Sequence, residues 1–500
     1  MISEINMHYF SDSSNNYFSN KAFSRISNIH FVGIGGSGMS GIAEVLHNLG
    51  LQITGSDIAK NDATNRLSRL GIRVAFCHIA ENAAYCDAIV ASSAIPKDNI
   101  ELLVAKKRRI PIIHRAEMLA ELMRFKYGIA VAGSHGKTTT TSLIATILAE
   151  ANQDPTFVVG GKLNKFSSNA KLGSGEFFVA EADESDESFL HLSPLLAVIT
   201  NIDNDHLSHY GSDVNNLKKA FLEFTHRLPF YGLAVVCRDD PSIAECMHNI
   251  SRPLLSYGFS EEADIRAISY KQQYNTSSFK VLLPSESQPR DVVLNLPGKH
   301  NVLNALAAIA VALELKIDFS LIAATLANFH GIGRRFQIHG KFFINQQINN
   351  QSFLLIDDYG HHPKEIHSVI SSIKDGWPDS RLIIVFQPHR YTRTAQLLTD
   401  FVNVLAMADY IILLDIYSAG EEIIENISSQ VIIDEIANNH QKIAKLMVPD
   451  SLILLEDSLL GMLGEIIREG DILLMQGAGD IGKLTTKIVA KLQTFEDIKV

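Results

Sequence analysis

Cysteine is scarce in this sequence, and long apolar runs are absent. The four cysteines, Cys77, Cys86, Cys237 and Cys246, form no Cys-x-x-Cys pair. This excludes the usual zinc-ligand and redox patterns, and we expect reduced thiols. No apolar run approaches the length that spans a bilayer, and the N-terminus lacks the charged and then apolar pattern of a signal peptide. We therefore expect a cytoplasmic protein with no membrane partner.

Net positive charge is also lacking, because 55 acidic residues against 44 Lys and Arg give a formal charge of −11. A nucleic-acid binder normally presents a basic face, so we expect no nucleic-acid partner. The apolar fraction of 46% is ordinary for a soluble globular protein. A chain of 500 residues is too long for one core, which predicts roughly two to four domains.

A polar N-terminal tail is followed by three segments in which short apolar runs alternate with helical periodicity. Residues 1–25 form the tail, where Ser and Asn dominate and disorder is expected. We predict domains over residues 26–123, 124–333 and 334–500. The strands expected in them are 29–33, 51–54, 72–76, 88–91, 128–132, 177–180, 196–200, 233–236, 353–356, 382–386, 410–414 and 472–475. The helices expected between them include 39–49, 138–151 and 302–315, and a β-meander is expected over 264–293.

This alternation is typical of parallel sheets with crossover helices. We predict an α/β protein of three tandem domains. The N-terminal domain is expected to be Rossmann-like, the central domain to be P-loop ATPase-like with a mixed sheet, and the C-terminal domain to be Rossmann-like again.

A phosphate-binding loop is predicted between a strand and a helix, at Gly133-Ser134-His135-Gly136-Lys137-Thr138. Glycines let backbone N–H groups close around phosphate oxygens, and the helix N-terminus adds a positive dipole. Lys137 can reach the β- and γ-phosphates, and the Thr138 hydroxyl can bind Mg²⁺. The common Walker A pattern has Gly where this chain has Val131, which indicates a shortened loop. These residues predict an ATP-binding protein that uses Mg²⁺.

A second glycine-rich turn, Gly33-Ile34-Gly35-Gly36-Ser37-Gly38, matches the dinucleotide fingerprint after a strand and before a helix. Asp57 lies near the end of the next strand, where a ribose-binding acid is expected. This pattern indicates a nucleotide diphosphate without specifying its base. A tight turn that binds no ligand is the alternative.

Two acidic segments also follow predicted strands. Residues 181–187 hold five acids in seven positions, and the end of the strand favours Glu181 as a Mg²⁺ ligand. The other acids of this segment are read as a solvated helix start. Residues 201–206 bring His206 and two acids to the edge of the sheet where ligands bind.

Two segments of the third predicted domain combine His with cationic or acidic residues. Arg390 and Arg393 are three residues apart, so on a helix they would share a face and could bind a carboxylate. Residues 357–363 carry two consecutive histidines after a strand. Adjacent residues point apart and no third ligand is suitably spaced, so we do not predict a metal there.

Together these segments resemble the Mur ligase family of peptidoglycan synthesis, over nearly the whole chain from Ile29 onward. The segments that carry the resemblance are GIGGSGMSG, GSHGKTTT, EADESD, NIDNDH, PGKHNVLNALAA, GIGRRFQ, DDYGHHP and FQPHRYTRT. Within the family, the first turn and the last two segments are similar to the branch that adds L-alanine to UDP-N-acetylmuramate.

The resemblance implies that the first domain holds the UDP-sugar, the second ATP, and the third the amino acid. It implies nucleotide-binding roles for Gly133, Ser134, His135, Gly136, Lys137, Thr138, Thr139, His300, Asn301 and Asn304. It implies UDP-sugar contacts for Gly33, Gly35, Gly36, Ser37, Gly38, Asp57, Ser93, His114 and Arg115. It implies amino-acid contacts for Tyr359, Arg390 and Arg393, catalytic roles for Lys137, His206, Arg335 and His361, and metal ligation by Thr138, Glu181 and His206.

The activity that the resemblance implies is amide formation through an acyl phosphate, with ATP, UDP-N-acetylmuramate and L-alanine as substrates and Mg²⁺ as cofactor. It would serve cell-wall biogenesis and hence cell shape and division, in a monomer or weak homodimer. Three alternatives are kept. They are a related ligase that adds a recycled tripeptide to the same sugar, an NAD-dependent oxidoreductase resting on the first turn alone, and a non-catalytic nucleotide-binding regulator.

Overall fold

A computed structural model describes residues 25–92, 94–166, 168–203, 205, 207–211, 213–284, 286–344, 351–440, 442–447 and 452–497. Residues 1–24, which make up nearly all of the predicted tail, lie outside this set. The chain divides into two compact units. Unit 1 runs to Lys162 and includes Phe166–Arg266 and Leu306–Ile322, whereas unit 2 consists of Leu163–Lys165, Ala267–Ala305 and the chain from Ala323 onward.

The first sheet, in unit 1, is parallel throughout and has the order β3-β2-β1-β4-β5. Its strands are β1 (Asn28–Val32), β2 (Gln52–Ser56), β3 (Arg73–Ala75), β4 (Ala88–Ala91) and β5 (Ile112–His114). Its helices are α2 (Ser37–Asn48), α3 (Asp62–Arg69), α4 (Ile100–Arg108) and α5 (Arg115–Met123), with the 3-10 turn η2 (Ala80–Ala83). Leu102 and Ala105 of α4 pack on Val32 and Ile89 of the central strands.

The second sheet lies mainly in unit 1, where its strands follow the order β12-β11-β10-β6-β9-β7-β8. These strands are β6 (Tyr127–Ala132), β7 (Thr156–Leu163), β8 (Ser168–Lys171), β9 (Phe177–Glu181), β10 (Leu196–Ile199), β11 (Leu233–Cys237) and β12 (Leu254–Gly258). The meander that follows consists of β13 (Ile265–Gln273), β14 (Thr276–Leu282) and β15 (Arg290–Leu294), in which β14 and β15 are antiparallel. The helices of this region are α6 (Lys137–Glu150), α7 (Val214–His226), α8 (Pro241–Cys246), α9 (Lys299–Glu314) and α10 (Phe319–Ala327).

The third sheet, in unit 2, has the order β16-β17-β21-β18-β19-β20, and only β16 is antiparallel to its neighbour. Its strands are β16 (Gln337–Ile344), β17 (Gln351–Asp358), β18 (Leu382–Phe386), β19 (Tyr410–Leu414), β20 (Ala444–Met447) and β21 (Asp471–Gln476). Its helices are α11 (Pro363–Gly376), α12 (Tyr391–Gln396), α13 (Leu398–Leu405), α14 (Ser429–His440), α15 (Leu452–Ile466) and α16 (Ile481–Asp497).

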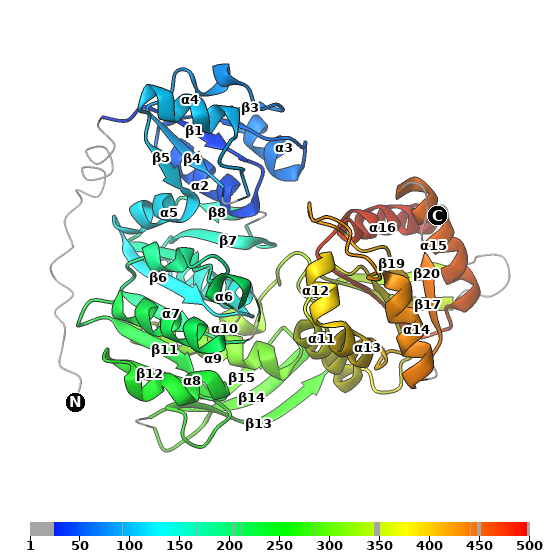
Figure 1. Cartoon of the computed structure of the whole chain (residues 1–500). Helices are drawn as coiled ribbons and strands as arrows, with labels where there is room; N and C mark the ends of the chain where they lie inside the picture. Colours follow the sequence, from blue (N-terminus) through cyan, green and yellow to red (C-terminus); the bar gives the residue numbers. More distant parts are fainter. Residues whose placement is uncertain are drawn as a thin grey trace. The chain divides into compact units, whose positions relative to one another are not determined.

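Helices cover both faces of this third sheet. One apolar core joins α11, α13 and α14 to one face, and a second core joins α15 and α16 to the other. Figure 1 shows these two groups of helices beside the strands of the sheet. Strands buried on both faces read as continuous apolar runs, which is why β18 and β19 are recognisable in the sequence.

The predicted fold class is confirmed, since the chain is α/β with three sheet-bearing regions and a mixed central sheet. Every predicted strand is present within about two residues of its expected bounds. The domain boundaries themselves stay a prediction. All four cysteines are free thiols. Within the described ranges, no helix has the length and apolarity needed to cross a bilayer.

Candidate functional site

The loop between β6 and α6 has the backbone shape that a phosphate-binding turn requires. Gly133 (φ +133°) and Gly136 (φ +82°) both occupy the left-handed region that favours glycine. A Cβ on Gly133 would lie 2.1 Å from the Thr200 hydroxyl, so no larger residue fits. Gly136 is the N-cap of α6, which aims the positive end of the helix at the loop. Thr138 and Thr139 are buried in the first turn of that helix.

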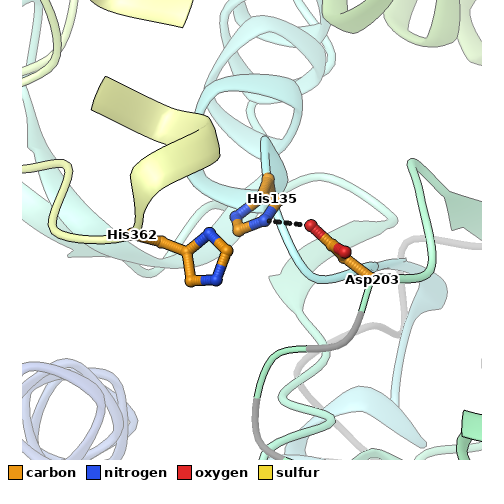
Figure 2. Close-up of side chains that lie close together, drawn as sticks. All are labelled: His135, Asp203 and His362. Atoms are coloured by element: carbon orange, nitrogen blue, oxygen red, sulfur yellow. Dashed lines mark hydrogen bonds and ion pairs between the residues drawn. The ribbon is translucent and has the colours of Figure 1, made fainter. Parts of the chain in front are cut away.

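The segment after β10 holds this loop in place. Asn201 accepts the Ser134 N–H through its carbonyl at 3.1 Å and the His135 N–H through its side-chain oxygen at 2.8 Å. The Nε2 of His135 lies 3.1 Å from a carboxylate oxygen of Asp203, as Figure 2 shows. The Asp203 N–H donates to the Ser134 hydroxyl at 2.9 Å. Asn201 and Asp203, both in the acidic segment singled out above, therefore position the loop.

Lys137 forms a buried ion pair that local sequence reasoning missed. Its Nζ lies 2.9 and 2.8 Å from the two carboxylate oxygens of Glu184, and it donates to the carbonyl of Gly133 at 2.6 Å. Glu184 is 1% exposed, so its expected place in a solvated helix start is wrong. Burial lowers the pKa of Lys137, but Glu184 and Asp183 outweigh this effect and the net pKa is raised. The ammonium is therefore held charged at the mouth of the loop.

Hard oxygen donors suitable for Mg²⁺ lie at the carboxyl ends of the strands in unit 1. Glu181 ends β9, and its Oε1 accepts the Gly160 N–H at 2.6 Å. With the Thr138 hydroxyl it offers the oxygen ligands that this ion prefers. His206, the third predicted ligand, lies outside the described residues. His362, also drawn in Figure 2, belongs to unit 2, where it caps α11.

The glycine turn after β1 is tied to the next strand. Asp57 accepts the Gly35 N–H at 2.8 Å and the Ala59 N–H at 3.1 Å, so its carboxylate anchors the turn. The carbonyl of Ser56 accepts the N–H of Gly33 at 2.8 Å and that of Ile34 at 3.0 Å. Gly36 is the N-cap of α2, and Ser37 begins that helix. The predicted contact Ser93 lies outside the described residues.

Arg115 joins the turn to the acidic segment. A Cβ on Gly38 would lie 3.0 Å from the Arg115 guanidinium, whose Nη2 is 3.1 Å from a carboxylate oxygen of Asp183. Burial would raise the pKa of Asp183, but Lys137 and Arg115 hold it below its usual range. His114 caps α5 through its Nδ1, at 3.4 Å from the Ala116 N–H. The turn, Arg115 and the Lys137 pair thus form one charged region within unit 1.

The predicted adenine and ribose contacts of unit 2 stand at the start of α9. Asn301 donates through Nδ2 to the Pro297 carbonyl at 2.7 Å, and Asn304 donates to the Asn301 side-chain oxygen at 3.2 Å. Burial lowers the pKa of His300 to about 4, so its imidazole is neutral at physiological pH. The arrangement supplies neutral donors and acceptors rather than charge.

Two arginines of unit 2 face the ring of Tyr359. The guanidinium carbons of Arg334 and Arg335 lie 5.2 and 5.1 Å from its centroid, within cation–π range. Arg335 also lies 3.6 Å from a carboxylate oxygen of Glu365. The ring of His361 meets Tyr359 edge-on at 5.5 Å. Three predicted residues of the third region, Arg335, Tyr359 and His361, are therefore close together.

Arg390 and Arg393 do not share a helix face, which corrects the expectation drawn from their spacing. Arg390 precedes α12 as its N-cap with φ +73°, and its N–H donates to the Tyr417 carbonyl at 2.8 Å. Its side chain is exposed, whereas Arg393 lies within the helix and is buried. The guanidinium of Arg390 lies 3.7 Å from the carboxylate of Glu421.

Glu421 and Glu184 are acids near predicted site residues that sequence reasoning did not single out. Glu421 also accepts the Thr392 hydroxyl at 2.7 Å and the Thr392 N–H at 3.1 Å. These bonds and Arg390 hold its pKa below the usual range, against the effect of burial. In the sequence, the only feature that could have pointed to Glu421 is its position after the apolar strand β19. Glu184 lay within the recognised acidic segment, and only its contact with Lys137 separates it from its neighbours.

Family models match all three regions of the chain. The models described as "Mur ligase family, catalytic domain", "Mur ligase middle domain" and "Mur ligase, glutamate ligase domain" match residues 28–127, 131–312 and 334–479. The three matches follow one another along the chain and take in both glycine-rich turns and Arg390.

Several solved structures of ligases are similar to this chain over most of its length. UDP-N-acetylmuramate-alanine ligase MurC from Thermotoga maritima is 29% identical with a TM-score of 0.78, over 93% of this chain and 99% of that one. A murein peptide ligase from Psychrobacter arcticus shares the fold at 22% identity and a TM-score of 0.69, over 93% and 98%. The UDP-N-acetylmuramate:L-alanyl-gamma-D-glutamyl-meso-diaminopimelate ligase of Neisseria meningitides is 27% identical with a TM-score of 0.57, over 62% of this chain and 100% of that one.

Proposed function

Because the chain belongs to the Mur ligase family, we propose that it is an ATP-dependent ligase of peptidoglycan synthesis that joins L-alanine to the lactyl carboxylate of UDP-N-acetylmuramate. The observation that carries this proposal is the likeness to the Thermotoga alanine ligase over nearly the full length of both chains. The products are the amide, ADP and phosphate.

The first chemical step is attack of the lactyl carboxylate on the γ-phosphate of ATP, giving an acyl phosphate. Both reactants are anionic, so catalysis depends on fixed positive charge. Lys137 supplies it at the loop, and Arg335 is assigned the same task. Thr138 and Glu181 would hold Mg²⁺, which when bound offsets phosphate charge. The ion pair with Glu184 already holds the Lys137 ammonium at the loop. When ATP binds, the ammonium would leave the Glu184 carboxylate and bind phosphate oxygens instead.

The second step is attack of the alanine amine on the acyl carbon, with release of phosphate. Arg390 and Arg393 are assigned to the alanine carboxylate, since guanidinium groups recognise carboxylates bidentately. His361 and Tyr359 are assigned to the same amino acid. Arg390 is exposed and its contact with Glu421 is long, at 3.7 Å, so it can turn to an incoming carboxylate.

A tripeptide acceptor is the second candidate. The Neisseria ligase, whose name gives a tripeptide as its substrate, is nearly as similar in sequence where it aligns, at 27% against 29%. The solved Neisseria chain is matched over its whole length, so the fairer comparison is the murein peptide ligase from Psychrobacter arcticus, which covers 93% of this chain as the Thermotoga ligase does. Its TM-score is 0.69 against 0.78, and its identity is 22% against 29%, which favours the alanine reaction. The oxidoreductase alternative receives no support from the family matches.

Phosphate release from ATP, Mg²⁺ and UDP-N-acetylmuramate tests the proposal directly. We expect release only with L-alanine, from a panel containing glycine, L-serine and the tripeptide. Lys137→Ala should abolish it, and Lys219→Ala, which changes an exposed lysine of α7, should not. Release with the tripeptide alone would transfer the assignment to the second candidate, and release with no acceptor at all would contradict the ligase.

A further inference from the structure

A cavity of about 470 Å³ lies in unit 2, at the edge of the third sheet where the parallel strands begin. Arg381 precedes β18, Tyr410 begins β19, and further walls come from the end of α15 and the turn that leads to β21. The candidate site residues Tyr359 and Arg390 instead follow the carboxyl ends of β17 and β18. At about 3.3 Å per residue, the five residues of β18 span roughly 16 Å, so the cavity is separate from the candidate catalytic site.

One edge of the Arg381 guanidinium is fixed by the protein. Its Nε and Nη2 donate to the two carboxylate oxygens of Asp471 at 3.1 and 2.6 Å, and Nη2 also donates to the Ile466 carbonyl at 2.5 Å. Asp471 is 3% exposed, so this bidentate pair holds the plane of the guanidinium in place. Among the residues that the structure describes, Nη1 has no partner. Arg381 therefore offers the cavity a positioned cationic donor that its own contacts leave unused.

Two further donors line the same cavity. Tyr410 is 8% exposed, yet its hydroxyl has no hydrogen-bond partner within the described part of the chain, although buried phenols normally find one. Asp471 raises the pKa of Arg381 through its hydrogen bonds, and Tyr410 adds to this effect, which places the hydroxyl near the guanidinium. Arg468 is exposed, and its guanidinium has no partner in the same part of the chain. Together these donors suit a carboxylate.

The end of α15 places acceptors beside these donors. The last carbonyls of a helix have no partner within the helix, and they carry the negative end of its dipole. Over the described ranges, the carbonyls of Gly464 and Glu465 accept no backbone hydrogen bond. The Glu465 carboxylate is exposed, lines the cavity and has no ion-pair partner in those ranges. Because the next residue, Ile466, binds Arg381, these acceptors lie close to the cationic donors, and they suit an ammonium.

Apolar side chains complete the wall of the cavity. Ile443, which stands just before β20, is 59% exposed, and Ile466 ends α15. The volume of about 470 Å³ lies within the range of small-molecule sites. The cavity therefore suits a ligand that carries a carboxylate, an ammonium and an apolar body.

We propose that this cavity binds a free α-amino acid with a large apolar side chain. Its carboxylate accepts hydrogen bonds from Arg381, Tyr410 and Arg468. Its ammonium donates to Glu465 and to the unpaired carbonyls at the end of α15. A zwitterion has no net charge, which matches the wall, since Asp471 neutralises Arg381 and the other two charges cancel. The site does not depend on the proposed function, because none of these residues takes part in the ligase reaction.

Calorimetric titration of the full chain with L-phenylalanine tests the site, with two analogues that each lack one charge. Hydrocinnamate has no ammonium, and phenethylamine has no carboxylate. We expect L-phenylalanine to bind with a dissociation constant of about 1 mM or below, as is ordinary for a ligand of this size. Each analogue should bind at least roughly tenfold more weakly, because charge-assisted hydrogen bonds are lost. An analogue that bound as tightly as L-phenylalanine, or no binding of L-phenylalanine at roughly 10 mM, would overturn the proposal.

Variants of the full chain locate the binding. Tyr410→Phe removes only a hydroxyl, and Arg468→Gln and Glu465→Gln change exposed side chains, so all three should fold. Each should weaken the binding of L-phenylalanine by roughly fivefold or more, and unchanged affinity in all three would contradict the site. Arg227→Gln, which changes another exposed arginine at the end of a helix, is the matched control and should have no effect. Arg390→Ala should also leave this affinity unchanged, and loss of binding there would assign L-phenylalanine to the candidate alanine site instead.

Discussion

Replacing Lys137 with methionine should damage stability as well as catalysis, and the two effects can be separated. Methionine keeps the apolar stem of the lysine and removes its ammonium. That ammonium binds both oxygens of Glu184, a side chain that is 1% exposed. In Lys137→Met the carboxylate would stay buried without its cation. The double variant Lys137→Met with Glu184→Gln removes both charges and keeps the shape of each side chain.

The expected cost follows from burial. Removing one member of a buried ion pair costs about 3–5 kcal/mol, because the remaining charge is desolvated and unpaired. Lys137 is 18% exposed, so water can reach the site and we expect the lower end, about 3 kcal/mol. For a folding unit of this size, this corresponds to a fall of roughly 6 °C in melting temperature. The double variant should recover most of that loss.

The loss of stability in Lys137→Met should depend on pH, and the direction of this dependence can be predicted. Burial raises the pKa of Glu184, and Lys137→Met removes the attraction that opposes it. A carboxyl whose pKa is higher in the folded than in the unfolded state favours folding below its unfolded pKa, about 4.3. This contribution is lost as the pH rises through the folded pKa. The stability of Lys137→Met should therefore be closest to that of the wild type near pH 5, and the difference should be largest at pH 8.

Thermal unfolding of the full chain at pH 5 and pH 8, followed by circular dichroism, measures these differences. Phosphate release should be lost in both the single and the double variant, because neither has the ammonium. Lys219→Met serves as the control for a surface lysine. If the single variant melted like the wild type at pH 8, or the double variant were no more stable than the single, Glu184 would not be the counter-ion inferred here.

Two further predictions concern binding. Arg390→Ala should raise the KM for alanine by tenfold or more while the KM for ATP changes little, since a charge-assisted bond to the alanine carboxylate is lost. If steady-state kinetics showed a change in the KM for ATP alone, Arg390 would not belong to the amino-acid site. Chelation by EDTA should abolish phosphate release, and added Mg²⁺ should restore it. Glu181→Gln should need more Mg²⁺ than the wild type for half-maximal activity. If titrations gave equal Mg²⁺ requirements, Glu181 would not be a ligand of the ion.

The sheets were largely predictable because their central strands are buried on both faces. Such strands appear as short continuous apolar runs, and β4, β18 and β19 fall at the predicted residues. The strands that went unpredicted include β7, which contains two glycines, and β16, whose residues are mostly half-buried. These strands form through pairing with neighbours rather than through their own composition.

The glycine-rich turns were predictable for a related reason. A left-handed backbone angle after a strand admits few residues other than glycine, so the requirement at Gly133 and Gly136 is visible in the residue type itself. The lysine and threonine that follow stand at fixed positions of the helix start, and no distant contact is needed to place them.

The amino-acid sequence by itself determined the α/β class, the two phosphate-binding turns and the family, because these depend on residue type and spacing over a few positions. Only the tertiary structure decided which acids matter. Glu184 looks in the sequence like one more acid of a solvated helix start, and its role follows from its contact with Lys137. The tertiary structure also placed Arg390 outside the helix that its spacing had suggested. Burial and pairing across distant segments set the charge and direction of these groups, and neither is a property of the local sequence.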